Sequence, residues 1–213
     1  MITIKRFVFN PFQENTYLLF DETKECIIID PGCIDTYERD ILKKEIEKEL
    51  LKPLLLLNTH CHLDHVFGCK FVVNEYNVPF AAHPDDEFFI GITKDHAKNF
   101  GIEIEDNPPE ISRYVNEGEI VRFGQSNLKV IHVPGHSPGG VVFFNEQQGF
   151  IIAGDVLFQG SVGRSDLPKG DHQLLIEGIR RKLLILNEDV IVYPGHGEST
   201  TIGSEKIHNP FLI

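Results

Sequence analysis

The segment THCHLDH at residues 59–65 constrains this chain more than any other feature of its sequence. It places four potential metal ligands within six residues. If its first half is extended, His60 and His62 point to the same side, because side chains alternate along a strand. Asp64 and His65 follow at the start of an expected helix and approach from a second side. The segment therefore predicts one ion held by His60 and His62, and a neighbouring ion held by Asp64 and His65.

Three further candidate ligands, His136, Asp155 and His196, each follow a short apolar run and a glycine. The runs are Lys129–Val133, Phe150–Ala153 and Val190–Tyr193. Glycine permits tight turns and a close approach of the backbone. We therefore expect several strands to end at one edge of the fold, each delivering a ligand into a loop. Imidazole and carboxylate groups suit zinc, manganese or iron, and the set predicts two divalent metal ions with Asp155 as the bridging carboxylate.

The hydrophobic pattern predicts strands in both halves of the chain, with helices between them. The expected strands are Thr3–Phe9, Asn15–Phe20, Cys26–Ile29, Leu54–Leu57, Val78–Ala82, Ile120–Phe123, Leu128–Val133, Val141–Asn145, Phe150–Ala153 and Val190–Tyr193. The expected helices are Tyr37–Leu51, Leu63–Tyr76, Pro84–Phe100 and Gln173–Leu186, and the tail from Thr200 is expected to be a loop or a short helix. This α+β pattern predicts two sheets packed as a sandwich and flanked by helices. A length of 213 residues predicts one domain over residues 1–213.

Composition limits the partners and the location that we expect. Acidic residues outnumber basic ones by 32 to 20, a formal net charge of −12, which argues against nucleic acid as a partner. Met1–Asn10 lacks the pattern of a signal peptide, and apolar runs such as Leu54–Leu57 are too short to cross a bilayer. We therefore expect a cytoplasmic protein with a small-molecule substrate and no membrane partner. The oligomeric state is left open.

The remaining histidines and the cysteines have simpler interpretations. His132 lies inside an expected strand, and the other histidines outside the ligand set are interpreted as surface or core residues; they are His83, His96, His172 and His208. The four cysteines have no CxxC spacing and are expected to be free thiols. Cys61 lies between two ligands and is expected to point away from the metals.

The THCHLDH segment resembles the HxHxDH signature of the metallo-β-lactamase superfamily, and the three later ligands follow it in the same order. The resemblance runs from Asp30 to His196 and implies an αββα sandwich with a dinuclear site at one edge. It also implies the ligand sets: His60, His62 and His136 for the first metal; Asp64, His65 and His196 for the second; Asp155 for both. Asp30 resembles a position that supports the metal loops and is interpreted as structural.

Within that superfamily the chain looks most like the short glyoxalase II-like thioesterases, which hydrolyse S-lactoylglutathione. This likeness is carried by residues 154–158, 160–167, 194–197 and the tail from residue 200. Arg164 and Ser165 of this loop are predicted to bind the substrate. Arg164 could hold a substrate carboxylate or orient the loop over the metals, or it could instead pair with Asp166 or be solvated. Full-length glyoxalase II has a helical glutathione-binding domain, and only 17 residues follow His196. We therefore expect that another thiol carrier could replace glutathione.

The resemblance implies that a hydroxide bridging two zinc ions attacks the thioester, with Asp64 orienting it and taking its proton. Iron or manganese are alternative metals. A persulfide dioxygenase is a rival, because such enzymes resemble this chain in His60, His136, Asp155 and residues 163–166 and hold a single iron. Lactone or β-lactam hydrolysis needs the same hydroxide. A non-catalytic protein that keeps metal for stability is the least favoured alternative.

Overall fold

Two six-stranded sheets form the centre of the computed structural model, which describes residues 1–104 and 106–213. The first sheet contains, in spatial order, β1 (Thr3–Phe9), β2 (Glu14–Phe20), β3 (Glu25–Ile29), β4 (Lys52–Leu57), β5 (Phe80–Ala82) and β6 (Arg113–Tyr114). The second contains, in spatial order, β14 (Thr200–Thr201), β13 (Ile191–Pro194), β10 (Phe150–Gly154), β9 (Val141–Asn145), β8 (Ser126–His132) and β7 (Ile120–Phe123). β11 (Leu157–Phe158) and β12 (Ser161–Val162) form a separate ribbon.

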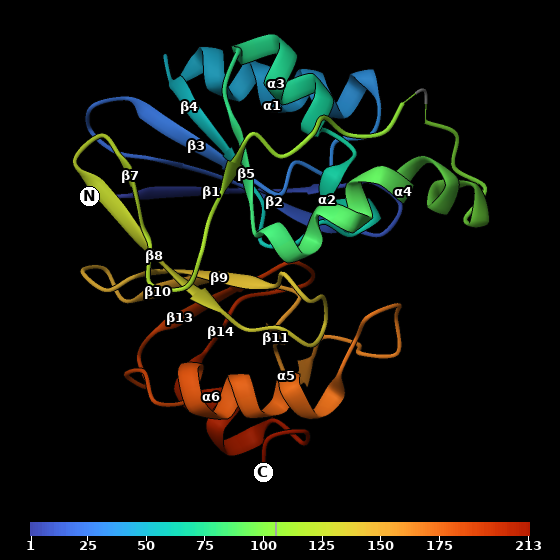
Figure 1. Cartoon of the computed structure of the whole chain (residues 1–213). Helices are drawn as coiled ribbons and strands as arrows, with labels where there is room; N and C mark the ends of the chain where they lie inside the picture. The colour runs from blue at the N-terminus through green and yellow to red at the C-terminus, as the bar shows by residue number, and fades with distance from the viewer. Residues whose placement is uncertain (105) are drawn as a thin grey trace.

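Helices cover the outer face of each sheet, which gives the order helix, sheet, sheet, helix (Figure 1). Those that follow strands of the first sheet are α1 (Thr36–Lys48), α2 (Leu63–Val66), α3 (Cys69–Tyr76), η1 (Pro84–Asp86) and α4 (Glu87–Asn99). Those of the second half are α5 (His172–Gly178), its continuation η2 (Ile179–Leu183) and α6 (Ile202–His208). Both sheets mix parallel and antiparallel pairs. The predicted αββα sandwich is therefore confirmed.

A shared apolar core lies between the two sheets. Leu19 and Ile29 of the first sheet belong to the same buried cluster as Phe143 and Ile152 of the second. Burying such side chains removes apolar surface from water and is the main force that holds the sheets together. Because the outer faces are also buried under helices, a strand such as β2 is buried along its whole length rather than at alternate residues.

Parallel pairing sets where the candidate ligands emerge. β3 pairs in parallel with β4 in the first sheet, and β10 pairs in parallel with β13 in the second. The two strands of each pair therefore end at the same edge of their sheet. The two edges meet where Asn15 N–H donates to the carbonyl of Gly195 at 2.7 Å, and where Glu14 bridges His196. β8 runs in the same direction as β10, because both are antiparallel to β9. β4, β8, β10 and β13, the strands that precede the candidate ligands, therefore end at one end of the sandwich, as the sequence predicts.

The structure differs from the sequence prediction in short elements. The helix predicted over residues 63–76 is divided into α2 and α3 at Gly68. Gly68 N–H donates to the Pro31 carbonyl at 2.7 Å, and the Asp64 carbonyl accepts from the Asn10 side chain at 3.0 Å, so the helical bond from Gly68 to Asp64 is replaced by bonds to other segments. β6, β11 and β12 are two-residue strands that leave no periodic signal. The tail, predicted as loop or short helix, forms β14 and α6.

The four cysteines are free and buried, as predicted. Cys61 lies in the apolar cluster beneath the first sheet's helices, together with Cys33 and Cys69. In the part of the chain that the structure describes, none of the helices has the length and hydropathy needed to span a bilayer.

Substituting Gly154 tests the close approach that ends β10. Gly154 has φ +49°, and a Cβ there would lie 2.2 Å from Thr59 Oγ1. Gly154→Ala is expected to lower the free energy of unfolding by about 1–2 kcal/mol for the backbone and about 1–3 kcal/mol for the collision. Gly149→Ala is the matched control, because Gly149 has φ +65° and open space around the added Cβ. Equal losses in urea denaturation of the two variants would contradict this packing.

Candidate metal centre

The THCHLDH loop is held by side chains on either side of it. The Asn58 amide donates to the carbonyls of His60 at 3.2 Å and His65 at 2.9 Å. Buried Asp86 accepts from Cys61 N–H at 2.8 Å and from Gly139 N–H at 2.6 Å, so it ties the loop to the segment that carries His136. Such side-chain bonds satisfy backbone groups that no strand or helix can pair. These bonds therefore hold the loop through its backbone and do not involve the candidate ligand atoms.

The first group of donors, His60, His62 and His136, has its ligand atoms within 4.8 Å of one another. His136 Nε2 lies 2.8 Å from His62 Nδ1 and 3.2 Å from His60 Nε2. The opposite nitrogen of His136 is occupied, because its Nδ1 faces the carbonyl of Arg164 at 2.7 Å. A ligating histidine usually donates its other N–H to such a group, which leaves the inner nitrogen free for a metal.

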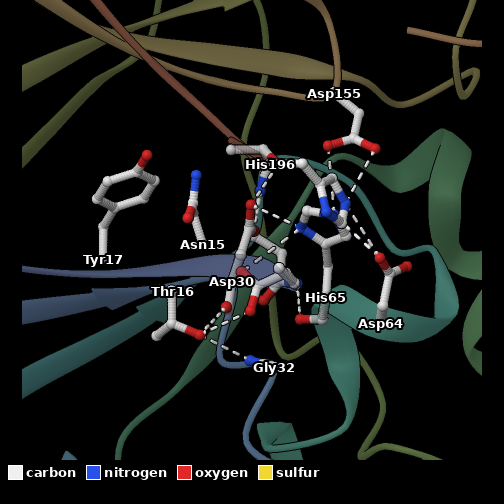
Figure 2. Close-up of polar contacts among 12 residues, drawn as sticks. Asn15, Thr16, Tyr17, Asp30, Gly32, Asp64, His65, Asp155 and His196 are labelled. Atoms are coloured by element: carbon white, nitrogen blue, oxygen red, sulfur yellow. Dashed lines mark hydrogen bonds and ion pairs between the residues drawn. The ribbon is translucent and has the colours of Figure 1, made fainter. Parts of the chain in front are cut away.

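The second group contains Asp64, His65 and His196, again within 4.8 Å (Figure 2). Asp64 Oδ2 lies 3.1 Å from His196 Nε2 and 3.8 Å from His65 Nε2. His196 Nδ1 faces the carbonyl of Phe12 at 3.1 Å, and His65 Nδ1 faces Asp30 Oδ2 at 3.2 Å. The Nε2 atoms of both histidines are thus directed inward, as is that of His136 in the first group.

Asp155 lies between the two groups. Its Oδ2 is 3.5 Å from both His136 Nε2 and His196 Nε2, and its Oδ1 is 3.4 Å from His65 Nε2. His65 Nε2 and Asp155 Oδ1 are buried and have no hydrogen-bond partner among the described residues. Leaving such atoms unpaired is costly, and a bound cation would satisfy both. A Cβ on Gly195 would lie 2.1 Å from Asp155 Oδ1, so glycine is required beside it.

The electrostatics of the buried groups also fit cations. Burial lowers the pKa of His60 well below its usual value, and burial lowers that of His62 to about 3. Burial acts to raise the pKa of Asp155, but nearby His65 outweighs it and the pKa lies well below its usual value. Burial acts to lower the pKa of His65, but Asp64 and Asp155 outweigh it and raise the pKa. His60 and His62 are therefore neutral and ready to ligate, while positive charge is favoured beside Asp155.

Asp30 supports the ligands through hydrogen bonds, and a second buried acid, Glu14, lies close to His65 and was missed in the sequence. Asp30 accepts from Thr59 N–H at 2.7 Å, from the Thr59 hydroxyl and from His65. Its oxygens also lie near His60 and His65 as a possible third ligand group, but they are already engaged, which agrees with the structural role predicted for Asp30. Glu14 accepts from the Thr16 hydroxyl at 2.8 Å, and its Oε1 lies 3.9 Å from His65 Nδ1. A single glutamate before a strand carries no sequence signal of such a position.

The loop predicted to contact the substrate is only partly at the site. Arg164 lines the cavity, yet its guanidinium makes two bonds to Asp166, at 2.8 and 2.9 Å. The pairing with Asp166 considered in the sequence is therefore present. Ser165 is outside the cavity lining, and its hydroxyl lies 3.2 Å from His172 Nδ1. The described structure thus brings the seven predicted ligands together with Arg164, but not with the Ser165 hydroxyl.

His83 and His132, interpreted as ordinary histidines, form a separate cluster with Asp85. Their rings are stacked with centroids 4.1 Å apart and planes 14° apart. The nitrogen lone pairs of the two rings lie in nearly parallel planes, so they do not converge on one ion. Asp85 is also exposed. We therefore do not count this cluster as a metal site.

A cavity of about 550 Å³ opens onto the two donor groups. Its lining includes His62, Asp64, His136, Asp155 and His196. A second cleft of about 570 Å³, beside α1 and α3, contains none of the seven candidate ligands. Ligand sites are usually concave with a few convergent polar groups, so the first cavity is the candidate reaction site.

Comparison with known proteins identifies the family. The model described as Metallo-beta-lactamase superfamily matches residues 9–196. This chain belongs to the metallo-beta-lactamase superfamily. It is similar to Hydroxyacylglutathione hydrolase GloC of Haemophilus influenzae, with 41% identity over 94% of this chain and 93% of that protein. The resemblance inferred from the ligand motif is therefore confirmed.

Solved structures of the superfamily have the same architecture. The BLEG-1 B3 metallo-beta-lactamase is 35% identical, with a TM-score of 0.90, and 99% of each chain is covered. TTHA1623, solved in a di-iron-bound form, is 38% identical, with a TM-score of 0.87, over 98% of this chain and all of that one. The chain is a metallo-hydrolase of the metallo-beta-lactamase superfamily, and its clusters of histidine and aspartate fit divalent metal binding.

Removing Asp155 tests its position between the two donor groups. Asp155→Ala is expected to lose bound metal and activity together, because it takes away the carboxylate nearest to both groups. Metal analysis of the dialysed protein measures the loss. Asp95→Ala is the control, since Asp95 is exposed and pairs with Lys98 on α4. An Asp155→Ala protein with full metal and full activity would rule out the bridge.

Removing one acceptor tests the supporting role of Asp30. Asp30→Asn presents an amide N–H₂ to groups that themselves donate, so the orientation of His65 is weakened. We expect metal affinity to fall about 10–100-fold, measured by competition with a chromogenic chelator. Loss of thermal stability with unchanged metal affinity would mean that Asp30 supports the fold alone.

Proposed function

We propose that this chain is a metal-dependent thioester hydrolase of the glyoxalase II type. The observation that carries the proposal is the pair of three-residue donor groups, joined by Asp155 and open to one cavity. In the proposal His60, His62 and His136 hold one divalent ion, and Asp64, His65 and His196 hold the other. The end-to-end similarity to GloC, named a hydroxyacylglutathione hydrolase, supports a thioester as substrate.

Zinc is the first choice of metal in this proposal, and iron is the main alternative. Five of the proposed ligands are imidazoles, which suit zinc and iron alike. The di-iron form of the similar TTHA1623 supports iron as a metal that such a site accepts. Ligand type alone does not separate the two metals, so metal analysis is part of the test.

Bound divalent ions supply a water that is hydroxide at neutral pH, and they polarise a carbonyl oxygen. Asp64 is proposed to orient this water and to accept the proton that the water loses when it becomes hydroxide, because Asp64 lines the cavity between the ligands. Burial acts to raise the pKa of Asp64, but His65 and His196 outweigh burial and lower it. The carboxylate is therefore ionised near neutral pH, as a proton acceptor must be.

The thiolate leaving group needs little protonation by residues of this chain. A thiol has a pKa of about 8.5, so its thiolate departs with little help from a proton donor. The polar side chains that line the cavity are histidines, aspartates, Ser161 and Arg164. An amide or ester would release a more basic group and would require a placed acid.

A panel of thioesters tests the proposal. The zinc-loaded protein is expected to hydrolyse S-lactoylglutathione or another thioester, and Asp64→Asn is expected to lower kcat by about 10²–10⁴-fold. Thiol release is followed with a disulfide reagent, and metal content is measured on each variant. Asp95→Asn is the matched control on an exposed carboxylate. Hydrolysis of none of the thioesters by protein with two bound metals would refute the proposal.

The same assay distinguishes thioester hydrolysis from the rival persulfide dioxygenase reaction. A persulfide dioxygenase would use one iron held by His60, His136 and Asp155, and would consume oxygen with glutathione persulfide. Thioester hydrolysis is independent of oxygen and needs both donor groups. His196→Ala is therefore expected to remove hydrolysis, whereas it would spare a reaction that uses only the first group and Asp155.

A further inference from the structure

The cavity is largely apolar once the metal ligands are set aside. Phe12, Phe100 and Phe158, together with Leu63 and Leu167, make up much of the remaining lining. We call the three phenylalanines the aromatic wall. They come from the turn before β2, the end of α4 and β11, so three separate segments bring an aromatic ring to one site.

The aromatic wall begins directly at the second donor group. The Phe12 carbonyl faces His196 Nδ1 at 3.1 Å, and its ring meets Phe100 edge-to-face with centroids 5.4 Å apart. The Phe158 ring lies 6.3 Å from the His196 ring. A group that entered the cavity to reach the ligands would therefore pass against these rings.

Part of the wall is open to solvent. Phe100 is 54% exposed, although its neighbours in α4 and the nearby loop form a small apolar cluster with Leu63, Phe67 and Ala97. One exposed aromatic residue is ordinary, but several that converge on a concave site near polar groups mark a place for an apolar ligand. Aromatic side chains contribute large contact areas when a ligand covers them.

Apart from the two proposed ions and the histidines, the same cavity offers few cationic groups. Among the described lining residues, Arg164 is the only lysine or arginine, and Asp166 already holds it with two hydrogen bonds. Glutathione carries two carboxylates at neutral pH, and proteins usually bind carboxylates with free arginine or lysine donors. The formal net charge of the chain, −12 before the proposed ions are counted, adds a repulsive field for anions over the rest of the surface.

We infer that the preferred substrate is an uncharged thioester whose apolar alkyl or aryl acyl group packs against Phe12, Phe100 and Phe158. This inference rests on the proposed thioester hydrolysis and names its substrate class. The aromatic wall determines specificity by covering apolar surface, while the ligand groups act on the thioester carbonyl beside it. An anionic carrier such as glutathione gains little from this wall.

The test compares acetyl, hexanoyl and benzoyl thioesters of N-acetylcysteamine, an uncharged thiol, with S-lactoylglutathione on the zinc-loaded protein. We expect kcat/KM to be at least about tenfold higher for hexanoyl than for acetyl. Phe100→Ala is expected to raise KM for the hexanoyl substrate about tenfold, with kcat and the acetyl substrate little changed. Phe100→Leu should retain most of the preference, and Phe211→Ala, at a residue 47% exposed and outside the cavity lining, should behave as wild type.

Binding of thioethers, which are not hydrolysed, separates this inference from the proposed function. S-hexyl-N-acetylcysteamine is expected to bind more tightly than the S-methyl compound by calorimetry, and Phe100→Ala should remove the difference. If no thioester is hydrolysed but this difference is present, the proposed function fails and the apolar site stands. Hydrolysis that is best with S-lactoylglutathione, or independent of the acyl group, would overturn the inference and leave the thioesterase standing.

Discussion

The candidate centre depends on the hydrogen bonds that the buried carboxylate of Asp30 accepts. Asp30 lies at the end of β3 and accepts hydrogen bonds from the backbone and hydroxyl of Thr59 and from His65. A buried carboxylate without partners would be very costly, so these bonds are a requirement of the fold. Parallel pairing of Ile29 with Leu57 brings Asp30 beside the loop after β4. One acid therefore positions a loop and orients a ligand of the second donor group.

The candidate centre joins the two halves of the sandwich. The THCHLDH loop extends from the first sheet, whereas His136, Asp155 and His196 follow strands of the second. Asn15 and Tyr17 strengthen the junction, since the Asn15 side chain donates to the Pro194 carbonyl at 2.9 Å and the Tyr17 hydroxyl donates to it at 2.7 Å. Ligands from both sheets couple metal binding to the packing of the sandwich. The rigid sheets hold the donors, while the loops and α4 shape what reaches them.

Much of the fold and of the ligand set could be predicted because their signals are local. The apolar runs before His136, Asp155 and His196 mark strands, and the four potential ligands packed into THCHLDH indicate a metal site on their own. Gly68 left no signal that it would divide a helix, because the hydrogen bonds that replace the helical one involve Pro31 and Asn10, which are far from it along the chain. Phe12 and Phe100 were likewise missed, since an isolated phenylalanine in a turn or at a helix end has the same appearance in a sequence whether it faces a cavity or the core.

By itself, the sequence determined the types of candidate ligand, their order along the chain and the strands that deliver them, because side-chain alternation and apolar runs depend on near neighbours. The tertiary structure alone decided which imidazole nitrogens face inward, that Asp155 lies between the two donor groups, that Arg164 pairs with Asp166, and that three phenylalanines line one cavity. The physical reason is that these features require contacts between residues brought together by the pairing of distant strands and the packing of two sheets, which no local pattern encodes.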